Sequence, residues 1–294
     1  MADAGKSVSP SERAKHLLHA ELETLWPTQS PELLKALHLL TREGHLNQDA
    51  RRKLKQVYHF VRLLLPVLEK IHAEVESPTI VDVGSGKSYL GFLLYDLWNG
   101  PLGRGEIANI ESRPELVANA RALAEKVGFD RMRFVDRPIR EADPGPTDLL
   151  VALHACDTAT DDAILLALEK DARAIALVPC CQAEVSRLLS GIPKEPKHPL
   201  WRLWRYPLHS REFGSHFTNA LRALVLEAMG YKVTVTELSG WEHSLKNELI
   251  LAVKKPEEKG APTTSPAREW LADLLRTIPA EPMLVRELRA RGKL

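Results

Sequence analysis

The 294-residue sequence has few of the features that mark secreted, membrane and metal-binding proteins. It contains three cysteines and no C-x-x-C pair, which argues against a disulfide framework and against a zinc site. No apolar run approaches the roughly 20 residues of a membrane span, and the first residues lack the apolar stretch of a signal peptide. A net charge of +1 excludes a uniformly basic nucleic-acid binder but not local basic patches. These absences predict a cytoplasmic protein with no bound metal and no membrane contact.

The most informative feature present is an expected buried strand that runs into a glycine-rich turn. Residues 79–91 have the sequence TIVDVGSGKSYLG, in which a Val- and Ile-rich run precedes Gly84 and Gly86. Such glycines adopt unusual backbone angles and let a ligand approach the N-terminus of the following helix closely. Asp82 lies two residues before the first glycine, and Ser85 follows it directly. Asp82, Gly84, Ser85 and Gly86 are therefore candidate cofactor contacts.

Two other nucleotide-binding motifs share part of this sequence. A P-loop requires a further glycine where the chain has Val81, and the strand runs directly into Gly84 without room for the long phosphate cradle. A dinucleotide-binding G-x-G-x-x-G turn requires a third glycine where the chain has Tyr89. Both alternatives stay open as weaker hypotheses.

Acidic residues end the next two expected strands. The second strand, about 106–110, ends in Glu111, where a carboxylate can accept both ribose hydroxyls of a nucleoside. The third, about 131–135, ends in Asp136, a candidate partner for an adenine amino group. For each acid the alternative is a loop-end carboxylate in water.

All three cysteines follow the next two expected strands. Strand four, about 148–153, runs into HACDTATD at 154–161, and strand five, 174–178, runs into PCCQ at 179–182. Ligands of open α/β sheets bind beyond the carboxyl ends of the strands, so the chemistry is expected here. The alternative is that small, soft side chains fill crowded strand ends.

Taken together, these motifs resemble those of class I S-adenosylmethionine methyltransferases. The sequence DVGSGK at 82–87 resembles motif I of that class. Segments 154–161 and 179–181 are similar to a branch of methyltransferase-like domains that resembles the eukaryotic acceptor-stem tRNA 2′-O-methyltransferase. The resemblance covers about 57–253. It implies a Rossmann-like, doubly wound, mostly parallel seven-stranded α/β sheet, S-adenosylmethionine as cofactor and RNA as substrate.

The resemblance also implies roles for single residues. It assigns cofactor contacts to Asp82, Gly84, Gly86 and Glu111, sulfonium contacts to His154 and Cys156, and the substrate side to Cys180 and Cys181. The chain departs from the tRNA enzyme at Asp157, where that enzyme has glycine. With three cysteines it also lacks that enzyme's additional zinc-binding segments.

Methyl transfer needs little acid–base chemistry, because the sulfonium is already activated and alignment of donor and acceptor supplies much of the acceleration. His154 and Asp157 are the candidate bases for a hydroxyl or amine acceptor. For His154, hydrogen bonding to the loop or the cofactor is the alternative. Cys180 and Cys181 are candidates for covalent catalysis, in which a thiolate adds to a pyrimidine ring.

Basic and aromatic residues alternate between strand five and the next expected helix, in the segment 194–211. Arginines can contact phosphates and aromatic faces can stack on bases, so Trp201, Arg202 and Arg205 are candidate RNA-binding residues. Packing of the tryptophans on the core is the alternative.

The chain is expected to divide into an N-terminal helical region (1–76), a methyltransferase domain (77–256) and a linker with a short C-terminal helix (257–294). Capping sequences at Ser9 and Ser30 predict helix starts in a wholly helical first region. A longer helix from about Asn47 has an apolar face and a basic face, and the basic face is either solvated or contacts phosphate.

Helix signals at Pro114 and Gly128 predict a helix over 114–127. A final hairpin at 231–238 and 248–253 completes the expected sheet. A helix from about Ala267 has a periodic apolar face that includes Trp270 and is expected to pack on the body.

Three functions are consistent with these features: a methyltransferase acting on RNA (tRNA or rRNA), which is preferred; a methyltransferase acting on a protein or small molecule; and a cofactor-binding domain without catalysis. The sequence does not determine the acceptor atom or the oligomeric state.

Overall fold

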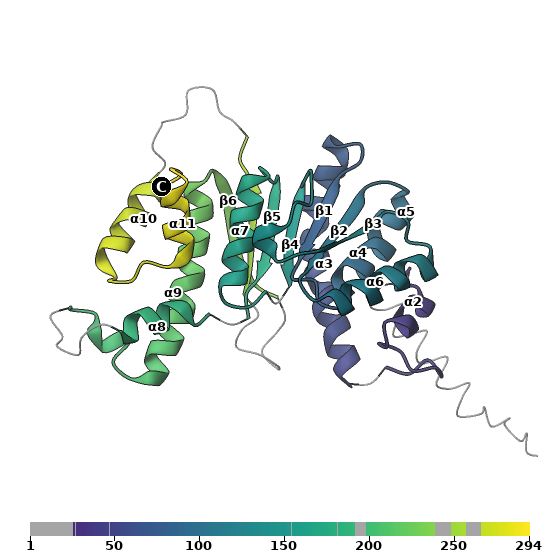
Figure 1. The fold of residues 1–294 in the computed structure, drawn as a ribbon, viewed down its shortest axis with the longest axis horizontal. Helices are drawn as coiled ribbons and strands as arrows, with labels where there is room; N and C mark the ends of the chain where they lie inside the picture. Colours follow the sequence, from purple (N-terminus) through teal and green to yellow (C-terminus); the bar gives the residue numbers. More distant parts are fainter. Residues whose placement is uncertain are drawn as a thin grey trace, which may run out of the picture.

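A computed structural model of the chain describes residues 26, 28–46, 48–153, 155–180, 182–191, 198–238, 248–256 and 266–294. Within these residues, seven strands form one sheet in the order β3-β2-β1-β4-β5-β7-β6 (Figure 1). The strands are β1 (Thr79–Val83), β2 (Glu106–Glu111), β3 (Met132–Asp136), β4 (Leu149–Leu153), β5 (Ala174–Val178), β6 (Tyr231–Glu237) and β7 (Glu248–Lys254). Strands β1 to β5 form the parallel part of the sheet, whereas β7 is antiparallel to both β5 and β6. This arrangement confirms the predicted fold class.

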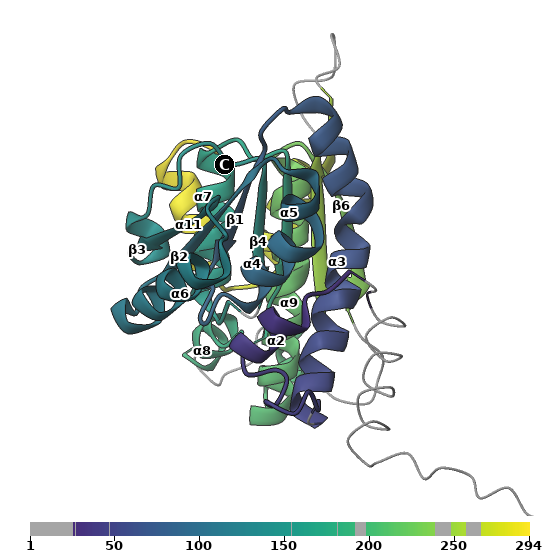
Figure 2. The same cartoon turned by 90° about the vertical axis from the view of Figure 1, so that its right-hand side faces the viewer.

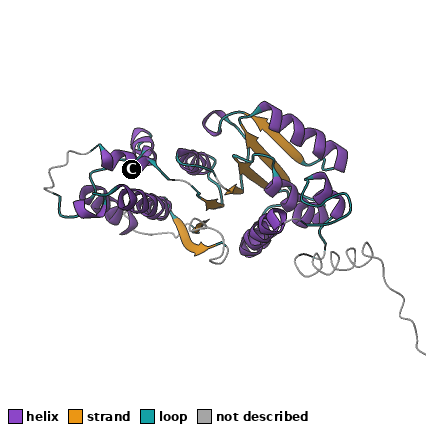
Figure 3. Cartoon of the chain, turned by 90° about the horizontal axis from the view of Figure 1, so that it is seen from below, coloured by secondary structure: helices purple, strands orange, loops and turns teal. Residues whose placement is uncertain are grey.

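Helices cover both faces of the sheet (Figures 1 and 3). Successive residues of a strand point to opposite faces, so Ile80 joins the hydrophobic core on one face and Val81 the core on the other. The helices that contribute to the first core are α2 (Pro31–Ala36), α3 (Gln48–Glu74), α4 (Tyr89–Leu94) and α6 (Pro114–Val127). Those of the second are α7 (Thr158–Glu169), α8 (Glu184–Ser190), α9 (Pro207–Ala228), α10 (Pro266–Thr277) and α11 (Met283–Ala290). The remaining short elements are a π-helical turn (Tyr95–Asn99), α5 (Gly100–Leu102) and 3₁₀ turns at Ile139–Glu141 and Trp201–Leu203.

Helix α3 is much longer than the strand that follows it (Figure 2). Its 27 residues span about 40 Å at 1.5 Å per residue, against about 17 Å for the five residues of β1. Because α3 ends just before β1 begins, the start of α3 extends beyond the carboxyl edge of the sheet. Leu54, Val61 and Leu64 on its apolar face are completely buried, which confirms that this face packs on the body.

The N-terminal prediction is only partly confirmed. Helix α2 starts where expected, because the hydroxyl of Ser30 accepts a hydrogen bond of 3.2 Å from the backbone N–H of Leu33. Residues 37–46 form turns and an isolated bridge between Leu40 and Leu46, so the expectation of a wholly helical first region is wrong there. The expected helix start at Ser9 lies outside the described residues.

Two helices were not expected. Helix α8 separates β5 from the basic-aromatic segment, so the expectation that this segment directly bridges strand five and the next helix is wrong. Helix α11 follows α10, packs against α7 and contributes Leu284 and Leu288 to the core. The prediction that the C-terminal tail packs on the body is therefore confirmed. Trp270, however, is 60% exposed, because it lies on the outer face of α10.

None of the helices within the described ranges combines the length and the apolarity that crossing a membrane would require.

Candidate cofactor and active site at the carboxyl edge of the sheet

The order of the parallel strands reverses at the centre of the sheet. After β1 the chain continues to β2 on one side, whereas β4 lies on the other side of β1 and continues to β5. Ligands of open α/β sheets bind outside the carboxyl ends of the strands at such a switch point. The predicted cofactor residues lie mainly at or just after the ends of β1 and β2, and the predicted catalytic residues follow β4 and β5, so the topology brings the two groups to one edge.

The glycine turn after β1 has the backbone geometry that its sequence predicts. Gly84 and Gly86 have φ values of +62° and +58°, which side chains with a Cβ rarely adopt. The N–H of Ser85 donates to the carbonyl oxygen of Ile110 at 3.1 Å and so fixes the turn to the end of β2. The turn leads into α4, and its backbone faces the switch point.

A third glycine of this segment, Gly91, has a role that the sequence did not reveal. A Cβ atom at this position would lie 2.2 Å from the side-chain oxygen of Asn109. Gly91 therefore lets α4 approach β2 closely. The only sequence signal was a glycine inside a helix, which often marks a packing requirement.

Asp82 is buried in β1, and one of its carboxylate oxygens has no hydrogen-bond partner among the described residues. Burial, together with the nearby charge of Glu111, raises the pKa of Asp82 to about 7. A buried carboxylate oxygen without a partner suits a ligand group that donates hydrogen bonds or carries positive charge.

Glu111 closes β2 and reaches across to the glycine turn. One carboxylate oxygen accepts the N–H of Gly86 at 2.8 Å, and Arg113 donates to both oxygens. Burial acts to raise the pKa of Glu111, but the hydrogen bonds from Arg113 and Gly86 outweigh it and hold the pKa below its ordinary value. The ionised carboxylate thus lies beside the turn, where the sequence placed a ribose contact.

Asp136 pairs in register with Glu111 across β2 and β3, which puts the two acids at the same edge. Its side chain is exposed. This position is compatible with the predicted contact to an adenine, and equally with a solvated carboxylate.

Beyond β4 and β5, two of the three cysteines meet. The sulfur atoms of Cys156 and Cys180 lie 3.0 Å apart, so the two strand ends converge. His154 and Cys181 lie outside the described residues. Among the residues that the structure describes, no group of three or more His, Cys, Asp or Glu side chains could hold a metal ion.

Asp157 has a different environment from the one expected of a base. One carboxylate oxygen accepts the N–H groups of Ala183 and Glu184 at 3.0 and 3.2 Å, and the other accepts Arg187 at 2.7 Å. Burial acts to raise the pKa of Asp157, but Arg187 and these backbone donors lower it overall. The carboxylate caps the start of α8, where Ala183 itself supplies no capping side chain.

The backbone of Asp157 explains the departure from glycine noted in the sequence. Its φ and ψ are 49° and −122°, and the N–H of Ala159 donates to the carbonyl oxygen of Cys156 at 3.0 Å. This is the geometry of a type II′ turn, in which glycine usually takes the first central position. The bonds of the Asp157 carboxylate to α8 offset the strain of an aspartate there.

A buried polar network beneath this loop was missed by the sequence analysis. Arg222 of α9 is 1% exposed and forms an ion pair of 2.7 Å with Asp161, which is equally buried. It also donates to the carbonyl oxygen of Asp157 at 2.8 Å and contacts Asn219 at 3.3 Å. Asn219 in turn accepts a hydrogen bond from Gln182 at 3.1 Å. The network ties the loops after β4 and β5 to α9.

The predicted substrate residues lie near the start of α9. Trp201 is half-buried, Arg202 and Arg205 are exposed, and Trp204 is buried in the core. The alternative that tryptophans pack inward thus holds for Trp204.

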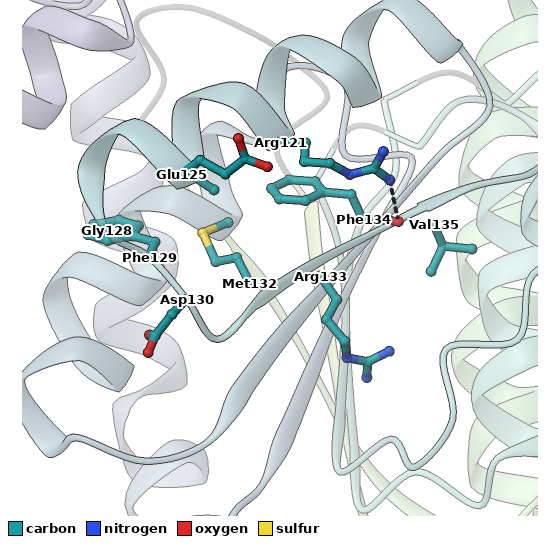
Figure 4. A pocket seen from close by; sticks show the side chains of 10 residues that line it. Arg121, Glu125, Gly128, Phe129, Asp130, Met132, Arg133, Phe134 and Val135 are labelled. Carbon is teal, nitrogen blue, oxygen red and sulfur yellow. Dashed lines mark hydrogen bonds between the residues drawn. The ribbon is translucent and has the colours of Figure 1, made fainter.

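The structure also has an open cavity of about 620 Å³ between α6 and β3 (Figure 4). Figure 4 shows Arg121 and Glu125 of α6 above the ring of Phe134 of β3, whereas the side chain of Arg133 extends away from α6. Because β3 is the outer strand of the sheet, this groove is separate from the switch point.

Residues 52–188 match the model of a family described as methyltransferase domain. The chain is similar to solved structures of SAH-bound Podospora anserina methyltransferase PaMTH1 (15% identity, TM-score 0.47, covering 86% of this chain and 100% of that one) and of SAH-bound magnesium protoporphyrin IX methyltransferase from Synechocystis PCC 6803 (13% identity, TM-score 0.44, 82% and 100%). It is also similar to an rRNA methylase from Streptococcus thermophilus (8% identity, TM-score 0.38, 60% and 87%). No curated protein matches the chain.

Over residues 52–188 the chain thus matches a methyltransferase domain, and the sheet order and the glycine turn agree with the expected Rossmann-like fold. The chain is an S-adenosylmethionine-dependent methyltransferase, and S-adenosylmethionine is its methyl donor. The carboxyl edge fits this cofactor: it offers a glycine turn with positive φ angles, an ionised acid for a ribose diol and a buried carboxylate oxygen without a partner among the described residues.

Proposed function

We propose that the chain methylates RNA, either tRNA or rRNA. The observation that carries this proposal is a surface cluster of half-buried Trp201 with exposed Arg202, Arg205 and Tyr206, which we call the arginine–aromatic cluster. The guanidinium of Arg205 lies 4.9 Å from the ring centre of Trp201 and 5.2 Å from that of Tyr206, and Arg202 lies 5.8 Å from Trp201. Such pairs present phosphate contacts and stacking faces together, as single-stranded or splayed RNA requires.

The position of this cluster supports a role next to the cofactor. Helix α9 begins directly after the cluster and leads into β6, whose first residue pairs with the last of β7 at the amino edge of the sheet. The start of α9 is therefore at the opposite edge, where the parallel strands end (Figure 1). Substrate held by the cluster would lie at the same edge of the sheet as the glycine turn.

A second basic surface borders this edge. The exposed residues Arg51, Arg52, Lys53 and Lys55 lie in the first two turns of α3, which extend beyond the sheet. The ammonium of Lys53 lies 5.7 Å from the ring centre of Tyr89, the first residue of α4. Since the net charge of the whole chain is only +1, two basic surfaces at one edge favour a polyanionic substrate.

Within this proposal the protein mainly binds and aligns. Bound S-adenosylmethionine supplies an activated methyl group. Asp82, Glu111 and the glycine turn would hold the cofactor, and the arginine–aromatic cluster would orient the acceptor in line. A base is needed only for a protonated acceptor, and we assign that role to His154 rather than Asp157. Asp157 has a lowered pKa and its carboxylate is engaged by α8, which makes it a weak base.

The cysteines leave a second mechanism open within the same function. Cys156 and Cys180 face each other at the ends of β4 and β5, where a thiolate could add to a pyrimidine of RNA. The in-line mechanism predicts that Cys180→Ser and Cys181→Ser retain turnover, whereas the covalent mechanism predicts a loss of several orders of magnitude in one of them.

Incubating the purified chain with methyl-labelled S-adenosylmethionine and separate pools of RNA, protein and metabolites tests the proposal. We expect label in RNA. Label in protein or in a small molecule would replace RNA with those substrates. Tight cofactor binding without transfer to any pool would indicate a non-catalytic domain. His154→Ala should reduce turnover by about 10²- to 10⁴-fold while cofactor binding stays unchanged.

RNA binding offers a second test that does not depend on turnover. The double change Arg202→Glu and Arg205→Glu should reduce RNA affinity by at least tenfold at low salt, because two phosphate contacts become repulsive. The matched control, Arg121→Glu with Lys126→Glu, makes the same charge change at exposed positions of α6. Equal losses in both proteins would show a non-specific charge effect and contradict the proposed binding surface.

A further inference from the structure

Arg113 occupies the hydrogen-bonding positions of Glu111 that a nucleoside ribose would use. Glu111 accepts four bonds: the backbone N–H groups of Gly86 and Arg113 donate one each, at 2.8 and 3.1 Å. The Arg113 side chain donates the other two, from Nε to one oxygen at 2.9 Å and from Nη2 to the other at 3.0 Å. An ionised carboxylate has about four acceptor sites, so the two backbone donors and the guanidinium fill it.

The two kinds of bond differ in whether they can be displaced. The backbone donors are fixed by the glycine turn and by the start of α6. The guanidinium is not, because the Arg113 side chain is 59% exposed, against 7% for Glu111. Its fork places one donor on each carboxylate oxygen, which is also the pattern that two neighbouring hydroxyls would make. A Cβ built on Gly86 would lie 3.7 Å from Nη2, so the guanidinium covers the face of the glycine turn.

The local sequence gives a further sign that Arg113 is not placed here to start the helix. Arg113 is the N-cap of α6 and forms no capping side-chain bond. N-caps favour Ser, Thr, Asp or Asn, and positive charge is unfavourable at a helix N-terminus. A residue that breaks a local helix rule points to a functional position.

We propose that Arg113 is a specificity-determining residue that occupies the ribose subsite in the free protein and is displaced when the cofactor binds. Only a ligand with a vicinal diol can replace both guanidinium bonds to Glu111. The fork therefore lowers the affinity for every nucleoside and lowers it most for those that lack a hydroxyl. In the free protein Arg113 also keeps Glu111 ionised next to the buried Asp82. This proposal rests on the S-adenosylmethionine site and is independent of RNA as the substrate.

Calorimetric titration of the full chain with S-adenosylhomocysteine tests the proposal, because binding is measured without turnover. In Arg113→Ala, we expect roughly threefold to tenfold tighter binding at low salt, since an exposed ion pair no longer has to break. In the wild type, raising the salt should tighten binding because it screens the pair, and Arg113→Ala should lose this dependence. Arg113→Lys, which keeps the charge but not the fork, should lie between the two.

Two further measurements complete the design. With 2′,3′-dideoxyadenosine as the titrant, Arg113→Ala should gain more affinity than with adenosine, because the dideoxy ligand cannot replace the guanidinium bonds to Glu111. Arg133→Ala is the control, because Arg133 also forms an ion pair with an acid of β2, Glu106, at the opposite end of that strand. It should leave binding and its salt dependence unchanged.

Weaker or unchanged S-adenosylhomocysteine binding by a folded Arg113→Ala protein, confirmed by its thermal unfolding, would overturn the proposal. Absence of binding in the wild type and in both Arg113 variants would overturn the cofactor site itself, and the proposal with it. Failure of RNA methylation alone would leave both intact.

Discussion

The two halves of the carboxyl edge differ in what their carboxylates bind. On the nucleoside side, residues 82–113, Asp82 has an oxygen without a partner and Glu111 is held by an exposed arginine that can leave. On the acceptor side, residues 155–187, Asp157 and Asp161 are bonded to backbone N–H groups, Arg187 and buried Arg222. The nucleoside side thus keeps its acidic groups for a ligand, whereas the acceptor side uses them to fix its loops. An acidic residue in a motif at a strand end is therefore not by itself a catalytic base.

The largest expected effect is on the acceptor side, at the buried ion pair. Arg222→Met should lower the free energy of unfolding by about 3 to 5 kcal/mol, because it leaves the Asp161 carboxylate buried without its partner. Urea unfolding measures the loss. The double change Asp161→Leu with Arg222→Met removes both charges and should be less destabilising. A single variant as stable as the wild type would show that this network does not hold the two loops.

On the nucleoside side, Asp82→Asn should change how stability depends on pH. The folded pKa of Asp82, about 7, lies above its ordinary value of 3.8, so between about pH 4 and pH 7 the folded state binds more protons than the unfolded state. Wild-type stability should therefore fall as pH rises through this window. Asp82→Asn should remove a loss of up to about 4 kcal/mol. Urea unfolding at pH 5 and at pH 7.5 measures the difference. Parallel pH profiles of the two proteins would show that Asp82 does not titrate in this range.

A smaller effect is expected where α4 approaches β2. Gly91→Ala should cost about 1 to 3 kcal/mol of stability, because the new Cβ collides with the side chain of Asn109. Adding Asn109→Ala should recover part of the loss. Gly191→Ala is a suitable control, since its φ is negative and its nearest neighbour would lie at 3.4 Å. Equal stability of the Gly91 variant and the control in thermal unfolding would rule out the close approach.

The smallest effect should come from Asp157. Asp157→Ala loses the cap of α8, worth about 0.5 to 2 kcal/mol, and Asp157→Gly should be more stable than Asp157→Ala because glycine adopts a positive φ without strain. Methyl-transfer assays on the two variants show whether Asp157 acts as a helix cap or as a catalytic base. If it only caps α8, both variants should show similar, modest losses of turnover. A common loss of 10²-fold or more in both folded proteins would restore Asp157 as a catalytic base.

The sequence predicts the nucleoside side well because its signals are local. A Val- and Ile-rich strand, glycines at Gly84 and Gly86 and the helix signals at Pro114 and Gly128 lie close together, and α6 has the predicted bounds. The acceptor side depends on partners far along the chain. The cap of α8 comes from Asp157, 26 residues before Ala183, and Arg222 lies 61 residues beyond Asp161. No local pattern distinguishes a buried arginine of α9 from an exposed one.

The most direct test of the central claim is calorimetric titration of the wild-type chain with S-adenosylhomocysteine. We expect one site per chain, with affinity lost when Glu111 is changed to Ala. No detectable heat with this ligand, together with clear binding of ATP or a nicotinamide dinucleotide, would contradict it.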